Sequence, residues 1–228
     1  MLDLEKHRLI MVQILKDIFS EFTLENSLGF KGGTAAYLLY DLPRFSVGLD
    51  FDLLPGAKEQ EVFFKLEQIL TSYGQVMDRQ QKRATLFFLL SYQQEQRNIK
   101  AEISKRVFPN RYEHRVFLGI PLRVMAKEDM FAHKLVALLE RKETAHRDLF
   151  DLWFFAKNQW ELHKELVELR TRLTFKQYVG KCIEKIGKMD ERYILHGLGE
   201  LLDPKIKAWA KANLKKELLF YFQARFLL

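Results

Sequence analysis

The spacing of hydrophobic and polar positions changes once along this chain. Before residue 127, helical spacing and strand-like alternation both occur, whereas the remainder is helical throughout. The predicted elements of the first part are helices over residues 3–22 and 58–73 and strands over residues 75–80, 85–92, 98–104 and, around Pro121, 115–126. The pattern predicts a mixed α/β (α+β) domain over residues 1–126 and a helical domain over residues 127–228.

The predicted helices have identifiable apolar sides. The side expected to be buried in the first helix consists of Leu9, Val12, Ile14, Leu15, Ile18, Phe19 and Phe22. Residues 23–27 read as a connector. Residues 160–228 predict three or four helices, and the last of these has a lysine-rich side made of Lys205, Lys207, Lys211, Lys215 and Lys216.

Residues 28–54 carry the most specific pattern, because they predict a short strand, a helix over residues 35–42 and a second strand containing Asp50 and Asp52. Residues two apart on a strand share a face, so these two carboxylates are expected to project together. Like charges held side by side are costly unless a divalent cation lies between them. The alternative is an ordinary solvated Asp-x-Asp.

Gly32 and Gly33 precede the helix of this segment. Glycines there allow a phosphate to approach backbone N–H groups at a helix N-terminus, where the helix dipole favours anions. The alternative is a tight strand-to-helix turn. Arg44, which follows the helix, could simply hold a helix C-terminus. A phosphate site followed by a carboxylate pair is what nucleotidyl transfer requires.

Composition narrows the class of protein. The chain has 228 residues, of which 48% are hydrophobic and 29% charged, with a single cysteine. We expect a soluble cytoplasmic protein with no signal peptide, no membrane span and no disulfide framework. Residues 1–156 contain 22 Lys/Arg against 21 Asp/Glu, and residues 157–228 contain 15 against 9. The excess of positive charge in residues 157–228 fits a surface that contacts nucleic-acid phosphates or, equally well, solvated helix faces.

Two helical stretches of the second part carry charged candidates. Lys134 lies at the edge of the apolar stripe of a helix over residues 127–142, so it either extends to solvent or projects into a cleft. Asp148 and Asp151 share a face of the next helix, and Arg147 is placed to pair with Asp151. Asp148 could instead be an acidic residue that is favoured by the helix N-terminus.

These motifs together resemble the AbiEii/AbiGii toxin-like nucleotidyltransferases of the DNA polymerase β-type superfamily. The resemblance covers roughly residues 28–156. It rests on KGGTA at residues 31–35, RFSVGLDFD at residues 44–52, the segment KAEI at residues 100–103, the lysine string around Lys134 and the RDLFDL string at residues 147–152. One position departs from the family pattern: Gly48 stands where the family usually has the first aspartate of its pair.

The resemblance implies a polymerase β-like mixed sheet with flanking helices, followed by a C-terminal helical bundle. It implies Mg²⁺ (or Mn²⁺) bound by Asp50, Asp52 and Glu102, with Lys134 and Asp148 as further catalytic residues and Arg147 and Asp151 in support. The implied nucleotide-binding residues are Lys31, Gly32, Gly33, Thr34, Arg44 and Ser46. The implied function is transfer of a nucleotidyl group from an NTP to tRNA or another RNA, bound by the basic C-terminal helices. The protein would be the toxin of a toxin–antitoxin or phage-defence pair.

Two alternatives remain open. Gly48 could mark a degenerate, non-catalytic protein that binds RNA or a partner, or the enzyme could act on a protein or small-molecule hydroxyl. The sequence does not specify the NTP, the acceptor, the antitoxin or the oligomeric state.

Overall fold

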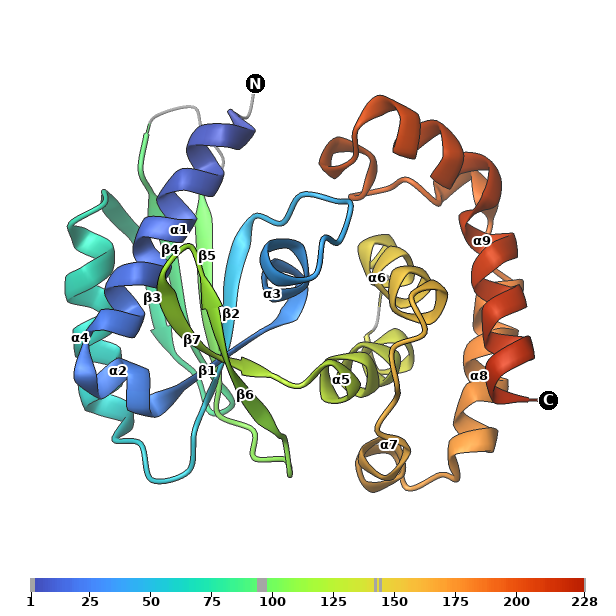
Figure 1. Cartoon of the computed structure of the whole chain (residues 1–228), viewed down its shortest axis with the longest axis horizontal. Coiled ribbons are helices and arrows are strands. Elements are labelled where there is room, and N and C mark those ends of the chain that lie inside the picture. Colours follow the sequence, from blue (N-terminus) through green and yellow to red (C-terminus); the bar gives the residue numbers. More distant parts are fainter. Residues whose placement is uncertain (1–2, 94–97, 142, 144, 228) are drawn as a thin grey trace. The chain divides into compact units, whose positions relative to one another are not determined.

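The computed structural model describes residues 3–93, 98–141, 143 and 145–227, and the chain forms two compact units (Figure 1). Unit 1 comprises Met1–Asp41 and Phe45–Met125, and unit 2 comprises Leu42–Arg44 and Ala126–Leu228. A three-residue segment from the first part of the chain therefore belongs to the second unit. No helix among the described residues is long and apolar enough to cross a membrane.

A seven-stranded mixed sheet in the order β3-β4-β5-β2-β1-β7-β6 forms the centre of unit 1, which confirms the predicted fold class. The strands are β1 (Leu28–Lys31), β2 (Gly48–Leu53), β3 (Gln75–Gln81), β4 (Thr85–Ser91), β5 (Ile99–Ser104), β6 (Tyr112–Phe117) and β7 (Ile120–Met125). At its centre, β2 runs antiparallel to β1 and parallel to β5.

The two faces of the sheet differ in character because side chains alternate along each strand. One face is apolar and fully buried; its central residues are Phe30, Leu49, Phe51, Leu86, Phe88, Ala101 and Ile103. Helices α1 (Leu4–Ser20) and α4 (Glu59–Thr71) pack on this face, as the ring contacts Phe19–Phe51 and Phe63–Phe88 show. Helix α3 (Gly32–Leu39) lies on the other side of the sheet (Figure 1).

Three predictions for this unit are wrong in detail. Leu9 and Phe22 are 58% and 79% exposed, because the buried stripe of α1 runs instead through His7, Met11, Ile14, Leu15, Ile18 and Phe19. The expected connector after α1 is a short helix, α2 (Phe22–Ser27), which the Glu21 side chain caps. Helix α3 begins and ends three residues earlier than predicted, because Asp41 turns into the left-handed region and Leu42 is buried in unit 2.

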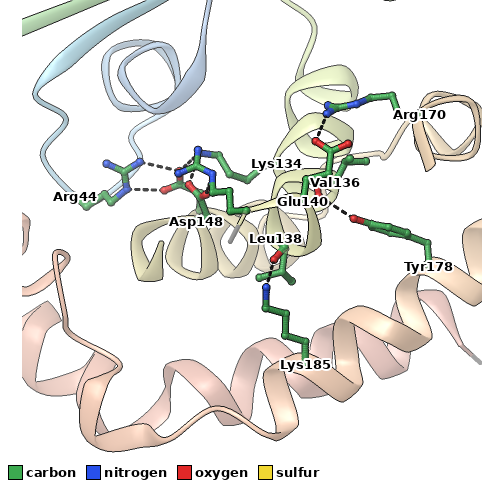
Figure 2. Close-up of polar contacts among 11 residues, drawn as sticks. Arg44, Lys134, Val136, Leu138, Glu140, Asp148, Arg170, Tyr178 and Lys185 are labelled. Carbon is green, nitrogen blue, oxygen red and sulfur yellow. Dashed lines mark hydrogen bonds and ion pairs between the residues drawn. The ribbon is translucent and has the colours of Figure 1, made fainter. Parts of the chain in front are cut away.

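Unit 2 is helical, as predicted. Its helices are α5 (Lys127–Glu140), α6 (His146–Lys157), α7 (Lys164–Thr171), α8 (Phe175–Gly187) and α9 (Pro204–Phe226), with short 3-10 turns at Glu191–Tyr193 and Gly199–Leu201. Side chains from α8 fix it to backbone carbonyls of α5: the Tyr178 hydroxyl donates to Val136, and the Lys185 ammonium donates to Leu138 (Figure 2).

Candidate active site

Asp50 and Glu102 are paired across neighbouring strands on the polar face of the sheet. The parallel register of β2 and β5 sets Gly48 beside Lys100, Asp50 beside Glu102 and Asp52 beside Ser104. Cross-strand partners share a face, so the two carboxylates lie next to one another on a rigid support. Both are partly exposed. The strand pattern predicted that Asp50 projects from the polar face, and the family resemblance implied that Glu102 lies on a neighbouring strand.

The carboxylate of Asp50 lies against the N-terminus of α3. A Cβ atom built on Gly32 would be 2.9 Å from Asp50 Oδ2, so the acid rests directly on the glycine backbone. Gly32 also has a φ of +82°, which L side chains rarely adopt. The side chain of the N-cap residue, Lys31, makes no capping hydrogen bond with the described residues of α3. The first N–H groups of a helix have no partner within the helix, so an anion could bind them beside the Asp50 carboxylate.

Gly32→Ala should be more damaging than the same change at a glycine with equal backbone strain. We expect Gly32→Ala to cost about 1–3 kcal/mol from the positive φ and, in addition, to push Asp50 away from α3. Gly56→Ala is the matched control, because Gly56 has a φ of +85° with nothing within 4 Å of its added Cβ. Thermal unfolding and nucleotide binding of both variants test this. Equal effects of the two variants on nucleotide binding would contradict the role given to the Gly32–Asp50 contact.

Asp52 shares the face of Asp50, as predicted, but its carboxylate is already occupied by protein groups. It is 3% exposed; Lys31 Nζ lies 2.5 Å from Oδ1, and the Tyr112 hydroxyl and Asn110 Nδ2 donate to Oδ2 at 2.8 and 3.1 Å. Among the described residues, no three His, Cys, Asp or Glu side chains are arranged to hold a metal ion. Asp52 thus contacts Lys31, Asn110 and Tyr112, and a metal site made of Asp50, Asp52 and Glu102 stays a prediction.

Two of the expected nucleotide-binding residues lie inside the fold. Thr34 is fully buried, and its hydroxyl hydrogen-bonds to the Ser46 hydroxyl at 2.8 Å and to the Gly48 carbonyl. Ser46 is 9% exposed. We therefore reassign Thr34 and Ser46 from nucleotide contact to the attachment of α3 to the start of β2. Gly33 is buried within the first turn of α3, and Lys31 is 23% exposed beside Asp52.

In unit 2, four of the predicted residues form a buried ion cluster (Figure 2). Arg44 contacts Asp151 with two parallel bonds, Nε–Oδ1 at 2.5 Å and Nη2–Oδ2 at 2.7 Å. The Lys134 ammonium lies 2.9 Å from both Asp148 Oδ1 and Asp151 Oδ2. Arg141 closes the cluster at the surface, 3.2 Å from Asp148 Oδ2. The two aspartates project from one face of α6, as their spacing predicted, and Lys134 reaches them from α5.

The surroundings of Asp151 and Lys134 favour the charged form of each. Burial opposes the charge on Asp151, but Arg44 and Lys134 outweigh it and hold the pKa of this carboxyl below its ordinary value of 3.8. Burial likewise opposes the charge on Lys134, but Asp148 and Asp151 raise the pKa of the ammonium above its ordinary 10.5. The stabilisation from Asp151 is thus present above pH 3.8 and is lost as pH falls through the lower folded-state pKa. The stabilisation from Lys134 is present below pH 10.5 and is lost as pH rises through the raised folded-state pKa of its ammonium.

This geometry corrects two assignments. Within the described part of the chain, Asp151 pairs with Arg44 and Lys134 rather than with Arg147, which is half-buried. Arg44 was expected at the nucleotide, but its side chain is 3% exposed and bidentate to Asp151. We therefore assign Arg44 a positioning role: it holds Asp151, and Asp151 together with Asp148 fixes the Lys134 ammonium.

Three residues that contact the predicted carboxylates were not among the predicted site residues. Asn110 and Tyr112 come from a turn-rich stretch, yet both reach Asp52, and Tyr112 lies flat on Gly29. Lys100 is paired with Glu102, its Nζ lying 2.6 Å from Oε2. The alternation of β5 does place Lys100 and Glu102 on one face, so their pairing could have been anticipated. The Tyr112 contact depends on which strands are neighbours.

The donor set at Asp50 and Glu102 suits Mg²⁺. This ion is usually held by one or two carboxylates together with phosphate oxygens and water, rather than by a complete protein cage. Asp50 forms no hydrogen bond or ion pair with other described residues, and it adjoins the helix terminus where a phosphate would bind. The residues present thus fit a magnesium ion shared with a nucleotide.

Comparison with known proteins agrees with this geometry. A family model described as the nucleotidyl transferase AbiEii toxin of a type IV toxin–antitoxin system matches residues 13–212. The chain belongs to the AbiEii family. Membership makes it a nucleotidyltransferase-family toxin of a type IV toxin–antitoxin system, and the family implies an antitoxin partner.

Two solved structures from Helicobacter pylori share the fold. JHP933 is 22% identical with a TM-score of 0.58, covering 97% of this chain and 94% of that one. A protein described as a candidate nucleotidyltransferase is 23% identical with a TM-score of 0.59, covering 96% of each chain. A search among curated proteins gives no match. At these identities the two structures support the fold of AbiEii-type proteins and not a shared substrate.

Proposed function

We propose that this AbiEii-family chain transfers a nucleotidyl group from an NTP to an RNA acceptor, tRNA being the first candidate, with Mg²⁺ as cofactor. The observation that carries the proposal is the position of Asp50: its carboxylate rests on Gly32 at the uncapped start of α3, with Glu102 beside it. A phosphate bound at the anion-favouring N-terminus of α3 would lie beside both carboxylates, which suits a divalent ion shared between the protein and the phosphate.

In this proposal the chain's own groups divide the work. The N–H groups at the start of α3 would hold phosphate oxygens, and Asp50 and Glu102 would hold Mg²⁺. When bound, Mg²⁺ supplies a Lewis acid that polarises the phosphoryl group and lowers the pKa of the attacking hydroxyl. Within unit 2, Asp148 and Asp151 fix the Lys134 ammonium, and the catalytic role that the family resemblance implies for Lys134 stays a prediction.

The basic surface of unit 2 supports an RNA acceptor. Lys205, Lys207, Lys211 and Lys216 are exposed on α9, whereas Lys215 is turned inward and donates to the Met189 carbonyl. The neighbouring helix α8 adds exposed Lys176, Lys181 and Lys188. Phosphate contacts made by such lysines release counterions, so RNA binding should weaken steeply with salt.

Binding of tRNA measured against salt concentration tests this surface. Replacing Lys207, Lys211 and Lys216 by Gln should reduce the slope of log K against log salt by about 2–3, since each lost phosphate contact removes about 0.7–0.9. Lys58→Gln with Lys82→Gln, two exposed lysines of unit 1, is the control and should leave the slope unchanged. An unchanged slope in the unit 2 variant would contradict RNA binding by this surface.

The reaction is tested with labelled ATP, CTP, GTP and UTP, Mg²⁺ and total tRNA. Transfer of label to RNA is the expected result. RNA binding without NTP binding would favour a non-catalytic protein, for which Gly48 is the relevant departure. NTP binding and label transfer to protein or to a small hydroxyl compound, but not to RNA, would favour the other acceptors. The predicted role in phage defence requires that such label transfer occurs.

A further inference from the structure

Two lysines lie among the three carboxylates on the polar face of the sheet. Lys31 pairs with Asp52, and Lys100 pairs with Glu102. Asp50, between them on β2, forms no ion pair with other described residues. Asp52 is held by Lys31, Asn110 and Tyr112, so Asp50 and Glu102 are the two carboxylates of this face left for a divalent cation. Two carboxylates suit one ion that is shared with phosphate oxygens.

The two ion pairs differ in how firmly they are held. Lys31 and Asp52 have side chains that are 23% and 5% exposed, and Asp52 has further partners in Tyr112 and Asn110. Lys100 and Glu102 are 43% and 35% exposed. An exposed pair of this kind contributes little to stability, so separating it costs little. Lys100 and Glu102 are the charged pair of this face that can exchange partners.

Gly48 leaves space for this exchange. It is the cross-strand partner of Lys100, and a Cβ built on it would be 2.8 Å from the Lys100 carbonyl oxygen and 3.6 Å from the Lys100 Cβ. The cross-strand neighbour of Lys100 on β2 therefore contributes no side chain beside the Lys100 stem. The Lys100 side chain is 43% exposed and lies on the face that carries Asp50.

We propose that Lys100 binds the triphosphate, exchanging its partner Glu102 for a phosphate oxygen while Glu102 joins Asp50 at a single divalent ion. This inference rests on the proposed function and adds a residue and a metal count to it. Before nucleotide binds, Lys100 neutralises Glu102. After binding, the Lys100 ammonium, a compact point charge, forms a charge-assisted hydrogen bond to a phosphate oxygen.

The exchange predicts two effects of opposite sign for Lys100→Met. The affinity for the NTP that binds should fall about 10- to 100-fold, as expected for loss of a hydrogen bond to a charged group. Calorimetry with Mg²⁺ measures this affinity for ATP, CTP, GTP and UTP separately. Affinity for Mn²⁺ without nucleotide should rise, because Glu102 is no longer neutralised. General damage to the fold would weaken both. Lys100→Arg should restore most of the nucleotide affinity.

Lys105→Met is the matched control. Lys105 follows the same strand, but its ammonium pairs with Glu59 at the start of α4, on the other side of the sheet from α3. We expect neither affinity to change. Titration of wild-type protein with Mn²⁺ and saturating nucleotide, read by electron paramagnetic resonance, should give one bound ion per chain.

The possible failures are distinguishable. If wild type binds NTP, Asp50→Asn abolishes binding and Lys100→Met has no effect on it, the proposed function stands and the exchange is wrong. Two Mn²⁺ ions per chain would also overturn the exchange. If wild type binds none of the four NTPs with Mg²⁺, the proposed function and this inference both fail.

Discussion

Asp50→Asn should reduce nucleotidyl transfer at least about 1,000-fold while leaving the fold intact. The amide keeps the shape of the side chain but removes the charge that holds the cofactor against the phosphate. Metal-ion stabilisation of a phosphoryl transition state is worth several kcal/mol, and about 4 kcal/mol corresponds to a factor of ~1,000. The measurement is label transfer from NTP to tRNA at saturating Mg²⁺.

Stability should separate this variant from a simple folding defect. Asp50 has no hydrogen bond or ion pair with other described residues, and its cross-strand neighbour is another carboxylate. Removing its charge therefore relieves repulsion, so the unfolding midpoint should stay the same or rise. Glu113→Gln is the control, since Glu113 is an exposed strand carboxylate on β6. Near-normal transfer by Asp50→Asn would exclude the site described here.

Arg44→Met should destabilise unit 2 by about 3–5 kcal/mol, the usual cost when one partner of a buried ion pair is removed. Methionine replaces the aliphatic stem but not the guanidinium, so the charge and both hydrogen bonds to Asp151 are lost. Asp151 is fully buried and would keep only Lys134 as a cationic partner. Because domains are typically stable by only about 5–15 kcal/mol, such a loss is large. Urea unfolding followed by tryptophan fluorescence measures it, since Trp153, Trp160 and Trp209 all belong to unit 2.

Arg192→Met provides the control for this prediction. Arg192 binds Asp190 through the same two nitrogens, Nε and Nη2, but its side chain is 81% exposed. We expect no shift of the unfolding midpoint, because water screens the pair. Asp151→Asn added to Arg44→Met should recover part of the stability, since the amide no longer leaves a buried charge with too few partners. Equal midpoints for Arg44→Met and Arg192→Met would show that the cluster is not a stabilising element.

The helix that begins at Gly32 was predicted to end three residues too late. The apolar pattern continued through Leu42, and a local pattern does not reveal that Leu42 is buried in another unit.

The local pattern also did not reveal the contacts of the two aspartates. Alternation placed Asp50 and Asp52 on one face, as in the structure, but Asp52 is occupied by Lys31, Asn110 and Tyr112. Asn110 and Tyr112 are 58 and 60 residues away from Asp52 in the chain, and Lys31 is 21 residues away.

The sequence alone determined the alternation of buried and polar positions in the strands, the helical character of the second unit and, through separated motifs, membership of the nucleotidyltransferase family. These features depend on short-range periodicity and on residues within one motif. Only the tertiary structure decided which charged groups meet. Strand order set Glu102 beside Asp50, the crossing of Leu42–Arg44 into unit 2 gave Asp151 its arginine, and the packing of Tyr112 on Gly29 enclosed Asp52. Contacts between distant segments depend on how elements pack together, which local sequence does not encode.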